Sequence, residues 1–381
     1  MDLYRKIIGD KGSKKADTDN EPLTNYLLDE DEELGFLNSN VISTNVLFSG
    51  SISSGIPIGK ISMISADSKS GKSILSLSLM KSAQQAGMTV ILIDTENSAD
   101  YKVIKQFGID TSKDKLMVFQ ENNIEAVRNI IAKIFDGLTK EERRKIFLVI
   151  DSWGALITTR TIDNAVAGKT VKDMSEAQLK NSLAGLLNNT KATTFIINHI
   201  YQNVGGFGDL LLIPGGKRAV FLSSTIILIN GRSKEKNSDG DVTGYILNAK
   251  TFKSRWSKEN TELKFRIKVN GGLDPFYGLL DDALEGGYVV TEKQGYYIRN
   301  CIENDKPIKE RDLYTSDFWI PIFKKTDFKD YIEKKYKYTN PLDLNNTELS
   351  DMFTSSAKDI TEAVEDTEKK VKKTKKVKEE V

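Results

Sequence analysis

The chain has 381 residues, 39% of them hydrophobic, and a formal net charge of only +1. This length and composition favour one substantial core with smaller attachments, and the near-zero charge means that any nucleic-acid surface must come from local clusters of Lys and Arg. The single cysteine, Cys301, excludes an internal disulfide framework, and no apolar run reaches the roughly 18 residues of a membrane helix. With no signal-peptide core at the N-terminus, we expect a cytoplasmic protein without a membrane role.

The N-terminal part of the chain is polar and charged. Residues 9–22 have the composition of a linker, and residues 29–33 are five consecutive acids. Such a segment cannot bury enough apolar surface to form a core. We therefore predict an arm and linker over residues 1–41.

A phosphate-binding loop is indicated directly after the apolar run Ile61–Ser65. A tight loop that opens a helix aims backbone N–H groups and the positive helix dipole at a phosphate. Gly71 would allow close approach, Lys72 would reach the outer phosphates, and the Ser73 hydroxyl would ligate Mg²⁺. The octapeptide alone could also be a polar turn, because Ala66 replaces the usual first glycine. The predicted nucleotide contacts are Ala66, Asp67, Ser68, Lys69, Ser70, Gly71, Lys72 and Ser73.

Two later apolar runs end in acidic residues. The run Thr89–Ile93 leads to Glu96 two residues beyond Asp94, and the run 146–150 ends in Asp151. Each acid alone could be a solvated loop residue, but two of them at strand ends after a phosphate loop favour a nucleotide triphosphatase. Glu96 is then expected to polarise the attacking water, and Asp151 is expected to act at the Mg²⁺ site.

Between residues 42 and 272 the sequence alternates β-branched runs with helical stretches such as Ser73–Ala86 and Ile124–Phe135. This alternation predicts an α/β core with a mostly parallel central sheet covered on both faces. The polar residues 233–241 predict a hairpin loop. Four later runs are expected to extend the sheet: Thr193–Asn198, Ser224–Asn230, Gly244–Lys250 and Leu263–Val269.

The remainder of the chain is predicted to form a smaller α/β lobe over residues 273–350 and a charged tail over residues 351–381. The lobe is expected to contain a helix over Tyr277–Glu285 and two strands around a turn at residues 292–295. In the tail, residues 359–368 are acid-rich and residues 369–378 hold seven lysines. Such a run is usually solvated, and nucleic-acid contact is the second interpretation.

The motifs ADSKSGKS, LIDTENSAD, FLVIDSWGAL, FIINH and IPGGKRAVF, in this order, resemble the RecA family of recombinases over residues 43–323. The segment NGGLDPFYGLLDDALEGGYVV, followed by GYYIR, is similar to the UvsX recombinases of certain tailed bacteriophages. The resemblance implies a RecA-like P-loop ATPase that uses ATP and Mg²⁺ and forms helical filaments on single-stranded DNA. It also implies strand exchange with homologous duplex DNA, partners such as a recombination mediator and a single-strand-binding protein, and the host cytoplasm if the protein is phage-encoded.

The resemblance also implies that ATP lies between neighbouring subunits. Lys253 and Arg255 match the family's cations that reach the γ-phosphate of the neighbour, although alone they could be surface charges beside a strand. His199 stands where the family has a γ-phosphate sensor, although a lone histidine is often structural. Asp100 stands at its expected place near adenine, and the nearest tyrosine is Tyr101. The family's adenine-stacking tyrosine is replaced by Val103.

Two segments, residues 157–172 and 200–217, match the family's DNA-binding loops. Their cations would contact phosphates without reading bases, and their glycines suit a loop that becomes ordered on DNA. A glycine-rich surface loop without function is the alternative for the second segment. The predicted DNA contacts are Arg160, Lys169, Lys172, Tyr201, Gly205, Gly206, Phe207, Gly215, Gly216, Lys217 and Arg218.

Two other functions share these motifs. A ring-forming RecA-like helicase or translocase would use the same nucleotide-site residues, but the chain contains no large N-terminal helical domain or cysteine cluster of the replicative-helicase kind. A non-enzymatic scaffold on single-stranded DNA, switched by ATP, is the second alternative.

Overall fold

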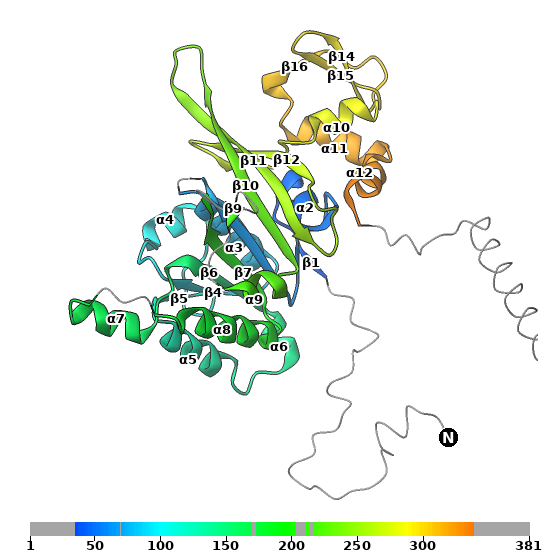
Figure 1. Cartoon of the computed structure of the whole chain (residues 1–381). Coiled ribbons are helices and arrows are strands. Elements are labelled where there is room, and N and C mark those ends of the chain that lie inside the picture. The colour runs from blue at the N-terminus through cyan, green and yellow to red at the C-terminus, as the bar shows by residue number, and fades with distance from the viewer. Residues whose placement is uncertain (1–34, 69, 170–172, 203–210, 213–215, 339–381) are drawn as a thin grey trace, which may run out of the picture.

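The computed structural model describes residues 35–68, 70–169, 173–202, 211–212 and 216–338 (Figure 1). Within these residues the centre of the protein is a nine-stranded sheet in the order β13-β12-β11-β10-β3-β7-β6-β4-β5. The strands are β3 (Ile61–Ala66), β4 (Thr89–Asp94), β5 (Leu116–Gln120), β6 (Ile146–Asp151), β7 (Thr193–His199), β10 (Thr225–Lys236), β11 (Val242–Ser254), β12 (Glu262–Lys268) and β13 (Gly272–Leu273).

The sheet is mixed but mostly parallel, which confirms the α/β class predicted from the sequence. All neighbours from β10 through β3, β7, β6 and β4 to β5 pair in parallel. The strands β10 to β13 continue the sheet with antiparallel pairs. The four later runs all lie in this sheet, as expected from their β-branched composition.

Helices cover both faces of the sheet. Because side chains alternate along a strand, neighbours such as Met63 and Ile64 enter two different hydrophobic clusters. One cluster contains α2 and α3, and the other contains α5, α8 and α9. The helices of this part are α2 (Ile42–Ser49), α3 (Lys72–Gln85), α4 (Tyr101–Gln106), α5 (Ile124–Phe135), α6 (Lys140–Arg144), α7 (Thr159–Val166), α8 (Glu176–Thr190) and α9 (Lys217–Leu222), with the 3₁₀ helix η2 (Trp153–Ala155).

Short strands pair outside the main sheet. β1 (Phe36–Leu37) pairs with β2 (Ile56–Pro57), and β8 (Tyr201–Gln202) pairs with β9 (Leu211–Leu212). Of the predicted N-terminal arm, only residues 35–41 are described, and residues 339–381, which include the whole predicted tail, lie outside the described part.

The hairpin loop predicted over residues 233–241 begins later in the structure than the sequence suggested. β10 continues to Lys236 and pairs with β11, so that Lys234 lies opposite Tyr245. The turn proper is held by Asn237, whose side-chain oxygen accepts from the backbone N–H of Asp239 and Asp241. Polar residues remain in strands here because backbone pairing does not require apolar side chains where a ribbon is exposed. Figure 1 shows this long β10–β11 ribbon extending away from α5 and α8.

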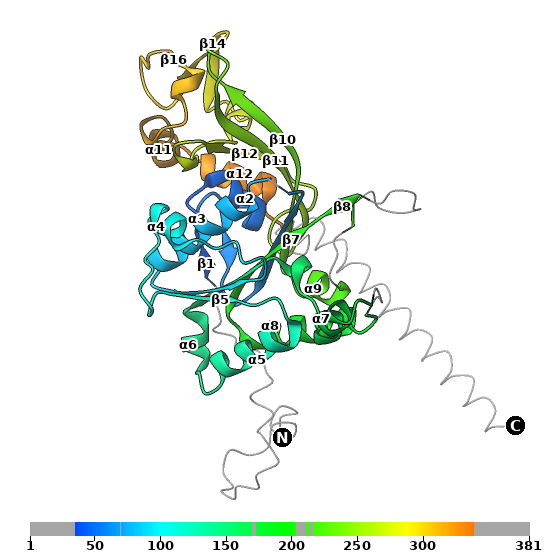
Figure 2. The same cartoon turned by 90° about the vertical axis from the view of Figure 1, so that its left-hand side faces the viewer.

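The C-terminal part forms a smaller lobe at the end of the molecule opposite α5 and α6 (Figure 2). Its three strands pair in antiparallel order, and the turn predicted between β14 and β15 is present. Phe318, Trp319 and Phe328 are fully buried in it. The elements are α10 (Leu280–Glu285), β14 (Val289–Lys293), β15 (Tyr296–Arg299), β16 (Ile308–Lys309), η3 (Glu310–Asp312), α11 (Ser316–Lys325) and α12 (Phe328–Tyr336).

The first helix of the lobe begins later than predicted. The sequence suggested a helix from Tyr277, whereas α10 begins at Leu280. Gly278 has a φ of +112°, and a Cβ atom there would lie 2.1 Å from the carbonyl oxygen of Lys264. The close approach to β12 therefore requires a glycine in a non-helical conformation, and the helix can only begin after it.

A buried ion pair joins the antiparallel end of the sheet to the start of the lobe. The side chains of Arg266 and Asp274 are 8% and 0% exposed, and their Nη2 and Oδ2 atoms are 2.6 Å apart. Glu235 on β10 accepts from the same guanidinium at 3.1 Å. The Arg266 guanidinium also lies over the rings of Tyr277 and Tyr314, at 4.8 and 4.4 Å from their centroids.

We predict that Asp274→Asn lowers the free energy of unfolding by about 3 to 5 kcal/mol, because it leaves a buried guanidinium without its carboxylate. Urea denaturation would measure the loss. Glu235→Gln is the matched control, since the partly exposed Glu235 should contribute about 1 kcal/mol or less. Equal losses in the two variants would contradict a dominant role for the buried pair.

Candidate nucleotide-binding site

The residues predicted to bind nucleotide meet at the C-terminal ends of the parallel strands. In parallel register, Ala66 of β3 lies beside His199 of β7, and Asp94 of β4 lies beside Asp151 of β6. Ligands of open parallel sheets bind beyond the carboxyl ends of the strands. The topology therefore brings together side chains that are far apart in the sequence.

The phosphate loop connects β3 to α3. Gly71 has a φ of +80°, and a Cβ atom there would lie 2.5 Å from Cδ1 of Ile267, so glycine is required both by conformation and by space. The Nζ atom of Lys72 donates to the carbonyl oxygens of Ala66 at 3.0 Å and Asp67 at 2.6 Å. The ammonium is thus held across the loop. Lys69 lies outside the described residues.

The electrostatics of Lys72 are set by burial. Its side chain is almost inaccessible, and desolvation lowers the pKa of the ammonium. The nearby carboxylates of Asp151, Glu96 and Asp67 oppose this shift. A buried ammonium that is held by neutral carbonyl and hydroxyl oxygens, including the Ser70 hydroxyl at 3.4 Å, can exchange them for the charged oxygens of an anion in the loop.

Asp151 lies in a cluster of carboxylates. Burial, and then the neighbouring charges of Glu96 and Asp94, raise the pKa of Asp151 to about 6, against the opposing effect of Lys72 and His199. Asp151, Asp94 and Ser73 line one pocket of 230 Å³. Carboxylate and hydroxyl oxygens are the ligands that Mg²⁺ takes in proteins, so this donor set fits the expected ion.

Glu96 is held by hydrogen bonds from two neighbouring strand ends. The Oε1 atom of Glu96 accepts from the Ser152 hydroxyl at 2.6 Å and lies 3.1 Å from Nε2 of His199. The Ser152 hydrogen bond is the main cause of the lowered pKa of Glu96, and His199 lowers it further. The structure therefore places the predicted γ-phosphate sensor in contact with the predicted base.

Three polar residues that received no role from the sequence shape the site. The buried carboxylate of Asp94 accepts from the backbone N–H of Ala99 at 2.8 Å, and also from those of Glu96 and Ser98, so it orders the loop that carries Glu96. The Thr95 hydroxyl accepts from the backbone N–H of Ser152 at 2.7 Å and donates to its carbonyl at 2.8 Å. Asp, Ser and Thr after a strand are known to bond nearby backbone groups, but their long-range partners are not visible in sequence.

Of the two predicted adenine contacts, one lines a pocket beside the phosphate loop and the other does not. Asp100 lines the 230 Å³ pocket and caps α4 by accepting from the backbone N–H of Lys102. Val103 lines the same pocket, whereas Tyr101 is 51% exposed and does not line it. A second pocket of 490 Å³ lies on the other side of the phosphate loop and includes Tyr245 and Val269.

Lys253 and Arg255 lie far from the phosphate loop of their own chain. The end of β11 pairs with the first residues of β10, which in turn pair with the beginning of β3, at the opposite edge of the sheet from Ala66. The Nζ atom of Lys253 donates to the carbonyl oxygens of Val220 at 2.9 Å and Phe221 at 2.7 Å, near the end of α9. Burial and the neighbouring Arg255 lower the pKa of Lys253.

The described part of the first predicted DNA segment is largely helical. α7 covers Thr159–Val166 and begins after Thr158, whose side chain accepts from a backbone N–H of the first turn. Arg160 and Lys169 are exposed. This helix corrects the expectation of a loop throughout residues 157–172, because Thr158 is a good N-cap.

In the second predicted DNA segment, Gly216 precedes α9, and Lys217 and Arg218 are exposed in its first turn. Tyr201 lies in β8, of which only the backbone is described. The predicted contacts that lie outside the described residues are Lys172, Gly205, Gly206, Phe207 and Gly215.

Across the described ranges, no helix is both long and apolar enough to cross a membrane. The same residues contain no group of three or more His, Cys, Asp or Glu side chains arranged to hold a metal without further ligands. The two carboxylates near Ser73 would thus need oxygens from a bound phosphate or water to complete a Mg²⁺ shell.

Comparison with known proteins gives two family matches. The model of the RecA N-terminal domain matches residues 33–274, and that of the C-terminal domain of the bacteriophage T4 recombination and repair protein matches residues 276–332.

Individual relatives agree with these matches. The "Recombination and repair protein" of Enterobacteria phage T4 is 29% identical over 307 residues, which are 77% of this chain and 76% of that protein. "Protein RecA" of a Nocardioides species is 31% identical over 62% of this chain and 66% of that protein. "Protein RecA" of Streptomyces rimosus is 30% identical over 62% of this chain and 61% of that protein. The chain thus spans less than two thirds of the length of these two RecA proteins.

We predict that Asp151→Asn stabilises the protein above pH 6. The folded-state pKa of about 6 exceeds the ordinary value of 3.8, so deprotonation costs more in the folded chain than in the unfolded one. The penalty is complete above about pH 6 and disappears as the pH falls toward 3.8. The variant should gain about 2 to 3 kcal/mol at pH 8 in urea denaturation and little at pH 4. Asp114→Asn, at an exposed position, should change neither value, and a gain that does not depend on pH would contradict the assignment to the Asp151 charge.

Proposed function

Because the chain belongs to the RecA family, we propose that it is an ATP-dependent DNA recombinase that forms helical filaments on single-stranded DNA. Within such a filament it pairs the bound strand with homologous duplex DNA and exchanges the strands. Its cofactors are ATP and Mg²⁺, and ATP is hydrolysed to ADP and phosphate in a DNA-dependent reaction.

The observation that carries the proposal is the position of Lys253 and Arg255. Both lie near the N-terminal end of β3, whereas the phosphate loop of the same chain follows its C-terminal end. They can therefore act on a nucleotide only if it is bound by another copy. A contact between two different surfaces of identical chains is heterologous, and repeated head to tail it generates an open helical filament or a ring. The cations then complete the γ-phosphate site in trans, as an arginine finger does.

Within one chain, a few residues bind the phosphates, hold Mg²⁺ and activate the attacking water. The Lys72 ammonium exchanges its carbonyl partners for β- and γ-phosphate oxygens, which are stronger acceptors because they are charged. Ser73 and Asp151 would hold Mg²⁺, which neutralises charge on the phosphates. Glu96, kept ionised by Ser152, orients and polarises the attacking water.

His199 connects this site to the DNA-binding segment. It contacts Glu96 at the end of β7, and the chain continues from it into β8 and the second DNA segment. A γ-phosphate that competes with Glu96 for the His199 ring N–H would move the start of that segment. ATP binding then favours the DNA-bound filament, and hydrolysis releases it.

The DNA surface consists of exposed cations on two segments. Arg160 and Lys169 belong to the first, Lys217 belongs to the second, and Arg218 directly follows it. Cations that contact phosphates without base-edge partners give binding that tolerates any sequence and weakens with salt.

We predict that Glu96→Gln slows DNA-stimulated ATP turnover by about 100-fold or more, since it removes the base but keeps the shape of the side chain. Filaments on long single-stranded DNA should still form with ATP and be visible by electron microscopy. Glu303→Gln, at an exposed site of the lobe, is the control and should turn over normally. Closed rings in place of filaments would favour a helicase, and normal turnover in Glu96→Gln would remove Glu96 from the chemistry.

We predict that two inactive variants restore activity when mixed. Lys72→Ala lacks a working phosphate loop, and Arg255→Ala lacks a cation for its neighbour. In a randomly mixed filament about one quarter of the interfaces join an intact loop to an intact cation, so turnover should recover to roughly that share. Mixing each variant with wild-type chain checks that both enter filaments. If both variants enter filaments but no activity returns, the action of Arg255 in trans is contradicted.

A further inference from the structure

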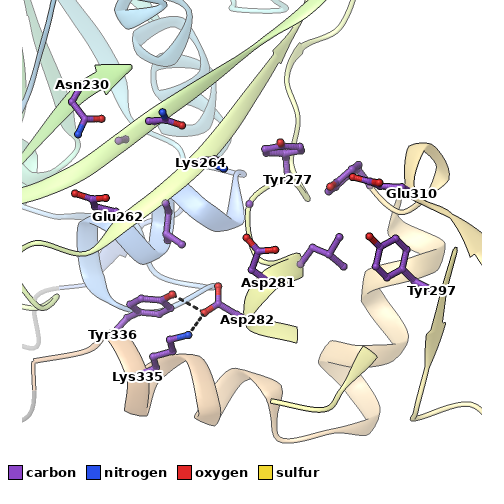
Figure 3. A pocket seen from close by; sticks show the side chains of 16 residues that line it. Asn230, Glu262, Lys264, Tyr277, Asp281, Asp282, Tyr297, Glu310, Lys335 and Tyr336 are labelled. Carbon is purple, nitrogen blue, oxygen red and sulfur yellow. Dashed lines mark hydrogen bonds and ion pairs between the residues drawn. The ribbon is translucent and has the colours of Figure 1, made fainter. Parts of the chain in front are cut away.

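A pocket of 550 Å³ lies outside the nucleotide site, between the antiparallel end of the sheet and the C-terminal lobe (Figure 3). Strands β11 and β12 form one wall, and α10, η3 and α12 contribute to the other. None of its lining residues belongs to the phosphate loop or to the predicted DNA segments. The proposed reaction therefore leaves this pocket without a role.

The wall of the pocket combines tyrosine rings with carboxylates. Four tyrosines line it, Tyr277, Tyr297, Tyr314 and Tyr336, and the carboxylates of Asp281 and Glu310 line the same pocket (Figure 3). Tyrosine faces attract cations, and a carboxylate beside the ring adds a direct partner. This chemistry suits lysine or arginine side chains.

Some of the pocket's acids already have partners. Asp282 accepts from Lys335 at 2.7 Å and from the Tyr336 hydroxyl at 2.6 Å, and Glu262 lies 3.7 Å from Lys250. These groups are neutralised within the chain and leave little attraction for a further cation.

Asp281 and Glu310 differ from these paired acids. Both are exposed, and neither makes an ion pair with any residue that the structure describes. After burial, the charges of Glu310 and Asp281 raise the pKa of Tyr297, which lines the same pocket. Lys264 also lines the pocket and opposes them in part. Asp281 and Glu310 therefore remain available to a cation from outside the described residues.

Cations already stack on tyrosines in this part of the molecule. The Arg266 guanidinium covers one face of Tyr277 and of Tyr314, and the Lys335 ammonium lies 5.3 Å from the centroid of Tyr336. The same rings thus bind basic side chains in the folded protein. A further cation in the pocket would repeat a contact that the fold itself uses.

The sequence contains a basic segment without an assigned role. Residues 369–378 hold seven lysines, and they follow the last described residue, Tyr338, by a segment of 30 residues, 339–368. The helix α12, which ends at Tyr336, contributes Lys335 and Tyr336 to the pocket wall. A segment of this length spans up to about 100 Å when extended, which is long enough for the lysine run to reach the pocket. A tethered ligand also has a high effective concentration at its own pocket.

We propose that this tyrosine-lined pocket is the docking site of the lysine run 369–378 of the same chain, with Asp281 and Glu310 as the charge partners of its ammonium groups. The run is matched to the pocket in charge, and its tether begins at the pocket wall. This inference is independent of the proposed recombinase activity, because it involves no residue of the nucleotide site.

Carbodiimide crosslinking of the full chain tests the proposal, since the reagent joins a carboxylate to an amine only where they touch. Mass spectrometry should find residues 369–378 joined to Asp281 or Glu310. Asp281→Asn combined with Glu310→Gln should lower the total crosslink yield of the run about tenfold, as expected for the loss of two charge pairs and a stacked cation. The matched control, Glu292→Gln with Glu303→Gln, removes two exposed acids of the same lobe and should leave the yield unchanged.

Two results would overturn the proposal. Crosslinks spread evenly over exposed acids of the lobe would show that the run has no preferred site. In a mixture of ¹⁵N-labelled and unlabelled chains, crosslinks that mostly join different labels would assign the run to a neighbouring copy instead. Thermal melts of both double variants check folding. A second variant leaves the pocket intact and changes the seven lysines of the run to glutamine. Backbone amide hydrogen exchange at residues 277–281 and 310–314 should become faster in this variant, and unchanged exchange would also contradict docking.

Discussion

The parallel register of β3, β7, β6 and β4 is the constraint on which the site depends. It places the C-terminal ends of these strands side by side, so that a phosphate loop, three carboxylates and a histidine converge from segments up to 133 residues apart in the chain. Pairing strands in this order requires helical crossovers, and the helices cover both faces of the sheet. These helical crossovers bury the strands and leave the C-terminal ends of the strands facing one common site.

The concentration of charge at this edge is costly for folding and useful for binding. Asp94 is satisfied by backbone N–H groups, and Glu96 by a hydroxyl and an imidazole. Among the described residues Asp151 has no comparable set of donors, which is consistent with its raised pKa, and Lys72 donates only to uncharged oxygens, those of the Ala66 and Asp67 carbonyls and the Ser70 hydroxyl. The two groups with the weakest compensation are those expected to meet Mg²⁺ and phosphate. Such a division is typical of a site whose electrostatics are completed by its ligand.

The antiparallel extension of the sheet, from β10 to β13, positions two features outside the nucleotide site. It carries Lys253 and Arg255 to the edge opposite the phosphate loop, and it also supports the C-terminal lobe through the buried pair of Arg266 and Asp274. In the proposed filament, another copy would supply these cations to the nucleotide site. At the far end, the junction with the lobe creates a second polar pocket, whose chemistry suits cations rather than phosphates.

The sequence by itself determined the α/β class, seven of the nine strands of the main sheet, the Gly-Lys-Ser turn that opens α3 and the acids at strand ends. These signals are local, because β-branched runs, a glycine before Lys-Ser and an acid after a strand act through neighbouring residues. The start of α10 and the length of β10 were misjudged, since a close backbone approach at Gly278 and the pairing of polar strand residues depend on other elements. Only the tertiary structure decided that Ser152 and His199 hold Glu96, that Asp94 orders its loop, and that Lys253 lies at α9. These contacts arise from strand order and packing over long sequence separations, which no local pattern encodes.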